Sequence, residues 1–317
     1  MLKIYSSNFR SPEASDPSAA RAPSPVWIDL IDPSEVERRQ AEQLLGRALP
    51  TRAQTSAIEL SNRLKSSEDA LRVNIPSFVR TDGERGPSTP LGFVLTPALL
   101  ATVRYASSPA FDQVAASFTS ESSSSGAEIF IQLIESIVNV AADRIESIAG
   151  HLSELSQAVF SEDSGRRGLL RAALFKVGRM QRQINQIRAA LLGVSRVVTY
   201  LCDAPPPFMS KTLQSQLKII HADIGSLNEF HQQLSERLQF LLDAVLGFIN
   251  NDQNDIMRVL TIVSVATVPP MILAGIWGMN FKFIPEYNWP HGYAFALSMI
   301  VVSMIIPLIA FRLKRWL

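Results

Sequence analysis

The sequence predicts an α+β protein in which an N-terminal α/β domain precedes a helical hairpin, a very long helix and two C-terminal membrane spans. Three observations support this class: short apolar runs separated by turn residues up to about residue 116, helical apolar spacing beyond residue 127, and two uncharged apolar runs near the C-terminus. The expected segments are a cytoplasmic α/β domain (1–116), a serine-rich break (117–126), a cytoplasmic helical hairpin and stalk helix (127–257), a first transmembrane helix (258–278), an outer loop (279–292), a second transmembrane helix (293–311) and a basic cytoplasmic tail (312–317).

Composition argues against several functional classes. The net charge of +1 gives no electrostatic reason to expect a nucleic-acid partner. The single cysteine, Cys202, excludes a disulfide framework, and the four histidines show no zinc-site spacing. The N-terminal stretch has no apolar region of the kind found in signal peptides. No phosphate-binding glycine loop, nucleophile elbow or paired acid motif is present, so we expect neither an enzyme nor a bound cofactor.

The first domain alternates strand and helix signals. Val26–Asp32 has the composition of a strand, and the sequence that follows predicts a helix with Asp32 as N-cap and Glu35 as its capping-box partner. A second capping box, Thr51 with Gln54, predicts another helix start. Three later apolar runs are also predicted strands, at 70–79, 91–96 and 99–105.

The middle of the chain is predicted to be helical. Glu128 to about Phe160 and Arg167 to about Leu201 have helical apolar spacing and form an antiparallel hairpin, which the prolines of 203–208 terminate. From Lys211 a further helix has no clear stop before Gly275, which gives a length of about 98 Å at 1.5 Å per residue.

The long helix carries an apolar seam that steps by four and three residues. Its members are Leu213, Leu217, Ile220, Ile224, Leu227, His231, Leu234, Leu238, Leu241, Val245 and Phe248. Such a heptad pattern predicts helix-on-helix packing. We expect the seam to pack partly on the hairpin of the same chain and partly on other copies of the helix.

Two runs of 19 residues without a charge, Val259–Trp277 and Tyr293–Phe311, have the length and composition of membrane spans. The alternative is a pair of buried helices in a soluble protein. Arg258 precedes the first run and three basic residues follow the second, whereas the loop between them carries Lys282 as its only lysine or arginine. The positive-inside rule therefore predicts an inner or plasma membrane protein with both termini in the cytoplasm.

Two spans from one chain cannot enclose an ion path, so any transport function requires an oligomer. One stripe of the first span, stepping by three or four residues, could line such a path; it comprises Met257, Leu260, Ser264, Val268, Met271 and Gly275. The same stripe could instead face lipid or a packing partner. The polar stretch Ile249–Asp255, which includes Asp252, either solvates the inner membrane edge or rings the inner mouth of a pore.

The tripeptide GMN at 278–280 follows the first span directly, the sequence IPEYNWPHGY forms the outer loop at 284–293, and the chain ends in RLKRWL. With these motifs the chain resembles the CorA family of magnesium and cobalt transporters. The order of α/β domain, hairpin, long helix and two spans also agrees along nearly the whole chain.

The resemblance implies a funnel-shaped homopentamer whose first spans line a pore for divalent cations. Gly278, Met279 and Asn280 would form its outer entrance, with Glu286 in the outer loop. A ring of amide oxygens can hold a still-hydrated Mg²⁺, which gives up its water reluctantly. The glycine would supply backbone freedom for the turn. Spacing alone favours another role for Asn280, as a helix C-cap.

Carried over from the family, the apolar stripe of the first span faces the axis, and Asp243 lies below the constriction. Two departures stand out. Met271 occupies a position where the family often has threonine, and Lys282 one where an acidic residue is common. The family also closes when intracellular Mg²⁺ binds between neighbouring cytoplasmic domains; Asp223 is a candidate ligand, or else a solvated surface charge.

The expected function is therefore a channel driven by the membrane potential, with Mg²⁺ as substrate and regulatory ligand and Co²⁺ or Ni²⁺ as lesser substrates. The expected partners are other copies of the chain, the lipid bilayer and divalent cations. Two alternatives stay open: a zinc transporter of the same superfamily, and a membrane-anchored coiled-coil scaffold that conducts nothing.

Overall fold

The computed structural model describes residues 1–7, 24–55, 64–67, 69–76, 89–118, 125–161, 166–280, 282 and 288–314. These residues fall into two units. The first comprises Met1–Asp163 with Ala172–Leu241, and the second comprises Ser164–Arg171 with Leu242–Leu317. Most of the predicted serine-rich break, 119–124, lies outside the described residues.

The first unit is built on a six-stranded sheet with the order β1-β2-β6-β5-β4-β3. Its strands are β1 (Leu2–Ser7), β2 (Ser24–Ile31), β3 (Leu64–Ser67), β4 (Ala70–Ile75), β5 (Leu91–Leu95) and β6 (Leu100–Arg104). The central pair β2 and β6 is parallel and every other pair is antiparallel. The sheet contains the four predicted strands together with β1 and β3; β3 lacked a sequence signal because it is short and largely polar.

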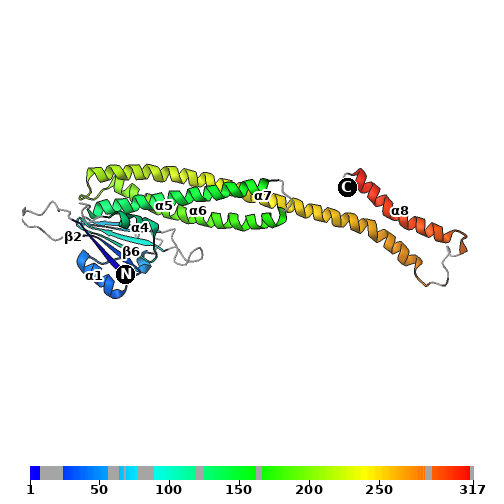
Figure 1. Ribbon diagram of the computed structural model, residues 1–317, viewed down its shortest axis with the longest axis horizontal. Coiled ribbons are helices and arrows are strands. Elements are labelled where there is room, and N and C mark those ends of the chain that lie inside the picture. Colours follow the sequence, from blue (N-terminus) through cyan, green and yellow to red (C-terminus); the bar gives the residue numbers. More distant parts are fainter. Residues whose placement is uncertain are drawn as a thin grey trace, which may run out of the picture. The chain divides into compact units, whose positions relative to one another are not determined.

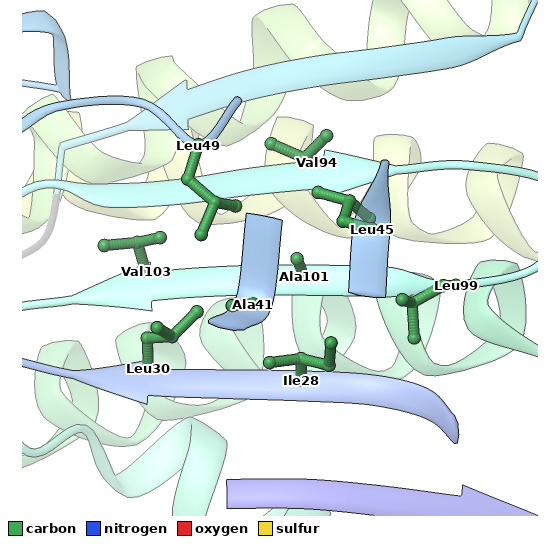
Figure 2. Close-up of a cluster of buried hydrophobic side chains, with 9 residues drawn as sticks. All are labelled: Ile28, Leu30, Ala41, Leu45, Leu49, Val94, Leu99, Ala101 and Val103. Carbon is green, nitrogen blue, oxygen red and sulfur yellow. The ribbon is translucent and has the colours of Figure 1, made fainter. Parts of the chain in front are cut away.

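Helices cover both faces of the sheet, so its central strands are buried on both sides. On one face, helix α1 (Glu35–Leu45) packs its apolar side over β2, β5 and β6 (Figure 2). The apolar cluster there consists of Ile28, Leu30, Ala41, Leu45, Leu49, Val94, Leu99, Ala101 and Val103. The alternation along β2 and β6 sends the intervening side chains to the opposite face.

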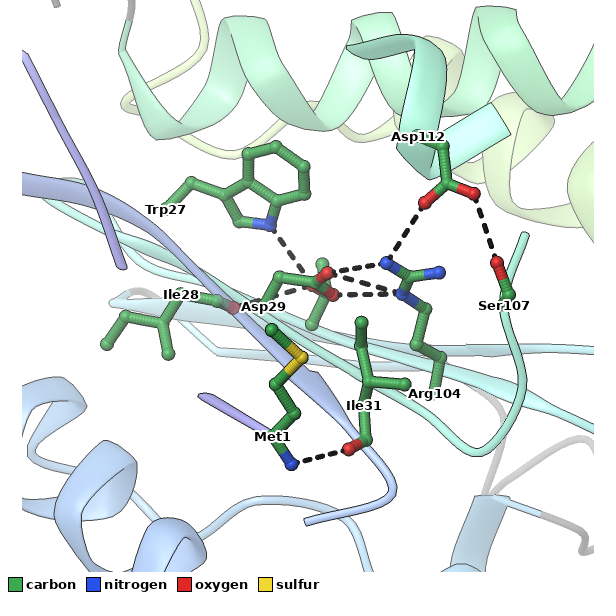
Figure 3. A network of polar contacts seen from close by, with 9 residues as sticks. Met1, Trp27, Ile28, Asp29, Ile31, Arg104, Ser107 and Asp112 are labelled. Carbon is green, nitrogen blue, oxygen red and sulfur yellow. Dashed lines mark hydrogen bonds and ion pairs between the residues drawn. The ribbon is translucent and has the colours of Figure 1, made fainter. Parts of the chain in front are cut away.

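That opposite face is covered by α4 (Pro109–Ser117) and α5 (Gly126–Phe160) and contains a buried polar network (Figure 3). Arg104 pairs with Asp29 at 2.8 Å, and both side chains are at most 2% exposed. Thr102 donates to Asp29 at 2.9 Å, and the indole of Trp27 donates to Thr102 at 3.0 Å. The guanidinium also lies over the Phe111 ring at 4.9 Å. The carboxylate is thus paired and hydrogen-bonded, as a buried charge requires.

The start of α1 corrects one sequence prediction. Its N-cap is Ser34 rather than Asp32, and the capping box joins Ser34 to Glu37 rather than to Glu35. The Ser34 hydroxyl accepts from the Glu37 amide at 3.3 Å, and the Glu37 carboxylate accepts from the Ser34 amide at 2.9 Å. Asp32 is still held by the sheet, because its amide donates to the Arg104 carbonyl at 2.8 Å. The Thr51–Gln54 box is present, at the start of α2 (Arg52–Thr55).

Three long helices complete the first unit: α5, α6 (Arg166–Asp203) and the first part of α7 (Lys211–Trp277), which lie side by side (Figure 1). The predicted hairpin and the uninterrupted long helix are both present, with α7 ending two residues beyond Gly275. A further capping box, Ser125 with Glu128, starts α5. Gly126 permits the close approach of α5 to the sheet, since a Cβ there would lie 2.9 Å from the Leu100 backbone nitrogen.

The apolar seam of α7 is buried within one chain. From Leu213 to Leu241 its members are buried or, at Leu227, half-buried. These side chains are therefore not available to other copies, and the part of the prediction that had this stretch also facing copies is wrong. The seam side of α7 lies against the hairpin helices of the same chain (Figure 1), and the side chain of its member His231 bonds the Ile184 backbone of α6.

The polar member of the seam, His231, is 5% exposed. Its imidazole bonds the backbone of Ile184 on α6, and its Nε2 has no hydrogen-bond partner among the described residues. Burial lowers the pKa of His231, and the nearby Arg188 guanidinium lowers it further.

The second unit contains the rest of α7 and helix α8 (Gly292–Leu313). Both are largely uncovered by the chain: of the apolar stretch in each helix, 6% is buried for α7 and none for α8. The alternative of two buried helices in a soluble protein therefore does not describe this chain, within the residues that the structure describes.

The buried ion pair gives a first prediction. Asp29→Ala removes the buried partner of Arg104 and leaves the buried guanidinium only the more distant Asp112 carboxylate, so we expect the free energy of unfolding to fall by about 3–5 kcal/mol. Asp112→Ala removes a half-exposed carboxylate 3.5 Å from the same guanidinium and should cost less than about 1 kcal/mol. Denaturant unfolding of both variants in detergent measures the difference; equal losses would show that the pair does not stabilise the unit.

The buried imidazole gives a second prediction, on pH. Because the folded pKa of His231 is lowered, the unfolded chain binds the proton more readily below about pH 6.5. The stability of the first unit should be retained above that pH and lost as the pH falls toward the folded pKa. His231→Leu should remove this part of the acid sensitivity, whereas His221→Leu, at an exposed position of the same helix, should not. The measurement is thermal unfolding between about pH 5 and pH 8, a range centred on the ordinary histidine pKa of about 6.5.

Candidate functional site

The candidate ion path belongs to the second unit. The predicted lining stripe of α7 is exposed along its length, with Met257, Leu260 and Met271 each more than half exposed. The other faces differ: Val259 and Ile272 are 61% and 55% exposed, whereas Ala266 is buried and Ile262 and Leu273 are half-buried. One chain therefore offers no enclosed path among its described residues, and it leaves the whole stripe free to meet lipid or other copies.

Two prolines interrupt the hydrogen bonding of α7 within the apolar stretch. Pro269 and Pro270 have no backbone N–H, so two carbonyls one turn earlier lose their helical donors. Nearby hydroxyls satisfy backbone groups rather than pointing to a site: Thr261 donates to the Met257 carbonyl at 2.7 Å and Thr267 to the Val263 carbonyl at 2.8 Å. Such bonds are typical of helices in an apolar environment.

The GMN tripeptide follows α7 directly. The Gly278 amide donates to the Ala274 carbonyl at 3.0 Å and the Met279 amide to the Ile276 carbonyl at 3.3 Å, so backbone groups close the helix end. The expectation that Gly278 supplies special backbone freedom is wrong, because its φ does not lie in the left-handed region. What a glycine provides here is space: a Cβ would lie 3.1 Å from the Ala274 carbonyl oxygen.

Asn280 is exposed, and its side chain makes no hydrogen bond with the described part of the chain. It does not adopt the left-handed conformation of a C-cap asparagine either. Lys282, two residues on, is also exposed. Glu286 lies outside the described residues. Where the chain resumes, Trp289 packs edge-on against Phe295 of α8 at 5.6 Å.

The candidate carboxylates outside the apolar stretches are not gathered into one site among the described residues. Asp223 is exposed, Asp243 is exposed, and Asp252 is half-buried; the last two interact with other residues of the chain. At the edge of the apolar stretch, Asp255 pairs with Arg258 at 3.6 Å. Across the described ranges, no three histidine, cysteine, aspartate or glutamate side chains come together as a metal-binding group.

Known proteins match this chain along most of its length. A family model described as CorA-like Mg²⁺ transporter protein matches residues 23–315. The magnesium transport protein CorA of Escherichia coli (strain K12) is 30% identical over 294 residues, covering 92% of this chain and 92% of that protein. The chain belongs to the CorA family.

Two further relatives agree. The magnesium transport protein CorA of Yersinia pseudotuberculosis serotype I (strain IP32953) is 29% identical over 296 residues, covering 93% of this chain and 92% of that protein. The complete structure of the CorA magnesium transporter from Methanocaldococcus jannaschii matches with a TM-score of 0.68 at 20% identity, covering 92% of this chain and 91% of that one. At that identity the structural match supports the fold alone.

Membership of the CorA family confirms three sequence predictions. The chain is α+β, with a mixed sheet domain followed by long helices. It is a transporter-family protein and not an enzyme. It is a membrane protein, since the family's function requires a bilayer and two of its helices are long and apolar enough to cross one. The pentamer, the orientation and the roles of individual site residues stay predictions.

Proposed function

We propose that several copies of this chain form a channel through which Mg²⁺ crosses the membrane. The observation that carries the proposal is the position of Asn280: an exposed amide without a partner among the described residues, directly beyond the first of two largely uncovered apolar helices. Relatives named as magnesium transport proteins support Mg²⁺ as the principal ion. Co²⁺ and Ni²⁺ are proposed as lesser substrates.

The channel needs several copies, because two helices cannot surround an ion path. A homopentamer, as the CorA resemblance implies, would place five copies of α7 around one axis. The stripe from Met257 to Gly275 would then line the pore and α8 would form an outer ring. The uncovered state of both helices in one chain leaves surface for these contacts and for lipid.

The chemistry of the entrance follows from Mg²⁺ itself. The ion prefers octahedral oxygen coordination and loses its water slowly. Amide oxygens of Asn280 from several copies would accept hydrogen bonds from the water shell, which captures the ion without binding it tightly. Neutral amides suit this task better than carboxylates, since an ion that binds weakly can also leave.

The interior of the proposed pore is mainly apolar. Met257 and Leu260 would form a constriction that closes by expelling water, and Met271 offers no hydroxyl at mid-depth. Asp243 and Asp252 would lie at the cytoplasmic mouth. With both termini in the cytoplasm, a potential of 100 mV, negative inside, favours entry of a doubly charged ion by about 4.6 kcal/mol, so no nucleotide hydrolysis is required.

In this proposal, a regulatory site for intracellular Mg²⁺ needs ligands from two copies of the chain. Asp223 is exposed, and no other carboxylate joins it in a three-ligand group among the described residues. A carboxylate from a neighbouring copy would have to complete the coordination. Mg²⁺ held there would keep the copies in a fixed arrangement and the constriction shut. Zinc is a less suitable ion, because the chain has one cysteine and four histidines to supply soft or borderline ligands.

The central test is Asn280→Ala in liposomes. Removal of the amide should lower Mg²⁺ uptake by about tenfold or more, equivalent to about 1.4 kcal/mol of barrier. Asn288→Ala, which removes the same side chain further along the same loop, should leave uptake unchanged. Unchanged uptake in Asn280→Ala would contradict the entrance role. No uptake by the unmodified chain would favour the non-conducting scaffold.

The charge at Lys282 gives a separate prediction. An exposed cation next to the entrance repels approaching Mg²⁺, so Lys282→Glu should raise uptake at low Mg²⁺ concentration. The gain should shrink as ionic strength rises, because exposed charges are screened beyond about 10 Å at 0.1 M salt. Initial uptake rates at several salt concentrations measure it. A gain that does not depend on salt would argue against an electrostatic cause.

A further inference from the structure

Helix α6 is strongly basic. In the part that belongs to the first unit, from Ala172 to Asp203, it carries five lysine or arginine residues, and its last residue is its sole acidic one. All five basic side chains are exposed; they are Lys176, Arg179, Arg182, Arg188 and Arg196. The whole chain has a net charge of +1, so this concentration of charge is a local property of the helix.

Helix α5 has the opposite character. Four of its acidic side chains are exposed against one exposed arginine. The four are Glu135, Asp143, Glu146 and Glu154. The two helices of one hairpin therefore present surfaces of opposite sign.

The charges form matching lines along the two helices. Arg182 and Arg196 are 14 residues apart, which is nearly four turns, so they share one face at a separation of about 21 Å. Glu135 and Glu146 are 11 residues apart, which is about three turns, so they also share a face, at a separation of about 16 Å. The difference is within the reach of flexible arginine and glutamate side chains.

These four residues have no partners within the chain. None of them forms a hydrogen bond or an ion pair with the described residues. The hairpin thus holds the two lines on neighbouring helices without letting them meet. A partner that satisfies both lines must offer an acidic helix face to α6 and a basic one to α5.

We infer that the Arg182–Arg196 line of one copy binds the Glu135–Glu146 line of the next copy in the assembly. The inference rests on the proposed oligomer and names a contact within it. Two different surfaces of one chain that complement each other form a head-to-tail contact, and such contacts close into a ring when the copies are related by rotation. Each copy then uses both of its lines.

A second copy fits better than a soluble polyanion. A polyanion would satisfy α6 and leave the acidic line of α5 unpaired, whereas a second copy satisfies both. The near-zero net charge also gives no long-range attraction for nucleic acid. Exposed ion pairs are worth at most about 1 kcal/mol each, so this contact sets which faces meet rather than how strongly the ring holds.

The test is a zero-length carbodiimide crosslink, which joins an amine to a carboxylate in direct contact. Full-length chains carrying Arg182→Lys and Arg196→Lys are produced as mixed ¹⁴N and ¹⁵N copies, assembled in detergent and crosslinked. Arg188→Lys is the matched control, because Arg188 is exposed on the same helix but lies about 120° around the helix axis from Arg182. Its guanidinium is near His231 instead.

We expect peptides that join position 182 or 196 to Glu135 or Glu146 and carry both isotope labels. The Arg188→Lys control should give no mixed-label peptide that joins position 188 to Glu135 or Glu146, and the peptides at 182 and 196 should be lost when Glu135→Lys and Glu146→Lys are added. Crosslinks with a single label, or none, in a particle of oligomeric mass would overturn this contact and leave the channel proposal intact. A monomeric particle would overturn both.

Discussion

The organisation of this chain depends on apolar helix surface that the chain itself does not cover. Along the first part of α7 the apolar seam is buried against α5 and α6, whereas in the apolar stretch that follows only 6% is buried, and in α8 none. Exposing a large apolar side chain to water costs about 1.5–3 kcal/mol, and the described part of these helices exposes many. A helix satisfies its own backbone, so it can enter hydrocarbon where a loop cannot. The surface therefore has to be covered by lipid or by other protein.

One continuous helix of 67 residues passes through both environments. Its first part is fixed by a seam in which His231 is the polar exception, and its apolar stretch is largely uncovered by the described part of the chain. A change in the packing of the seam therefore reaches the proposed pore without any intervening loop. The sheet domain is held independently, by apolar cores on both faces and by the Asp29–Arg104 pair. Rigid support at one end and a free surface at the other are what a gated channel subunit requires.

The sequence was sufficient for the elements whose physics is local. Four of the described strands (β2, β4, β5 and β6), the hairpin, the length of α7 and the two apolar stretches follow from periodicity and composition, and no neighbour overrides them. It failed where two local signals competed: Ser34 rather than Asp32 caps α1, because the sheet holds Asp32 through the Arg104 carbonyl. It also misjudged the seam, since period alone does not say whether the partner helix belongs to the same chain. The Asp29–Arg104 pair, 75 residues apart, could not be predicted without the register of β2 and β6.

The polar groups of this chain fall into two classes, those that hydrogen-bond within the chain and those that have no described partner in it. Asp29, Thr102 and the Trp27 indole are buried and bonded to one another, so their contribution is to the fold of one copy. Asn280 and Asp223 are exposed and have no partner among the described residues of the same chain. An exposed polar group of this kind is available to bind an ion. A single amide or carboxylate binds Mg²⁺ too weakly to select it, because the ion requires several oxygens in octahedral geometry. The function proposed for these residues therefore depends on the proposed assembly, in which each copy would contribute one ligand.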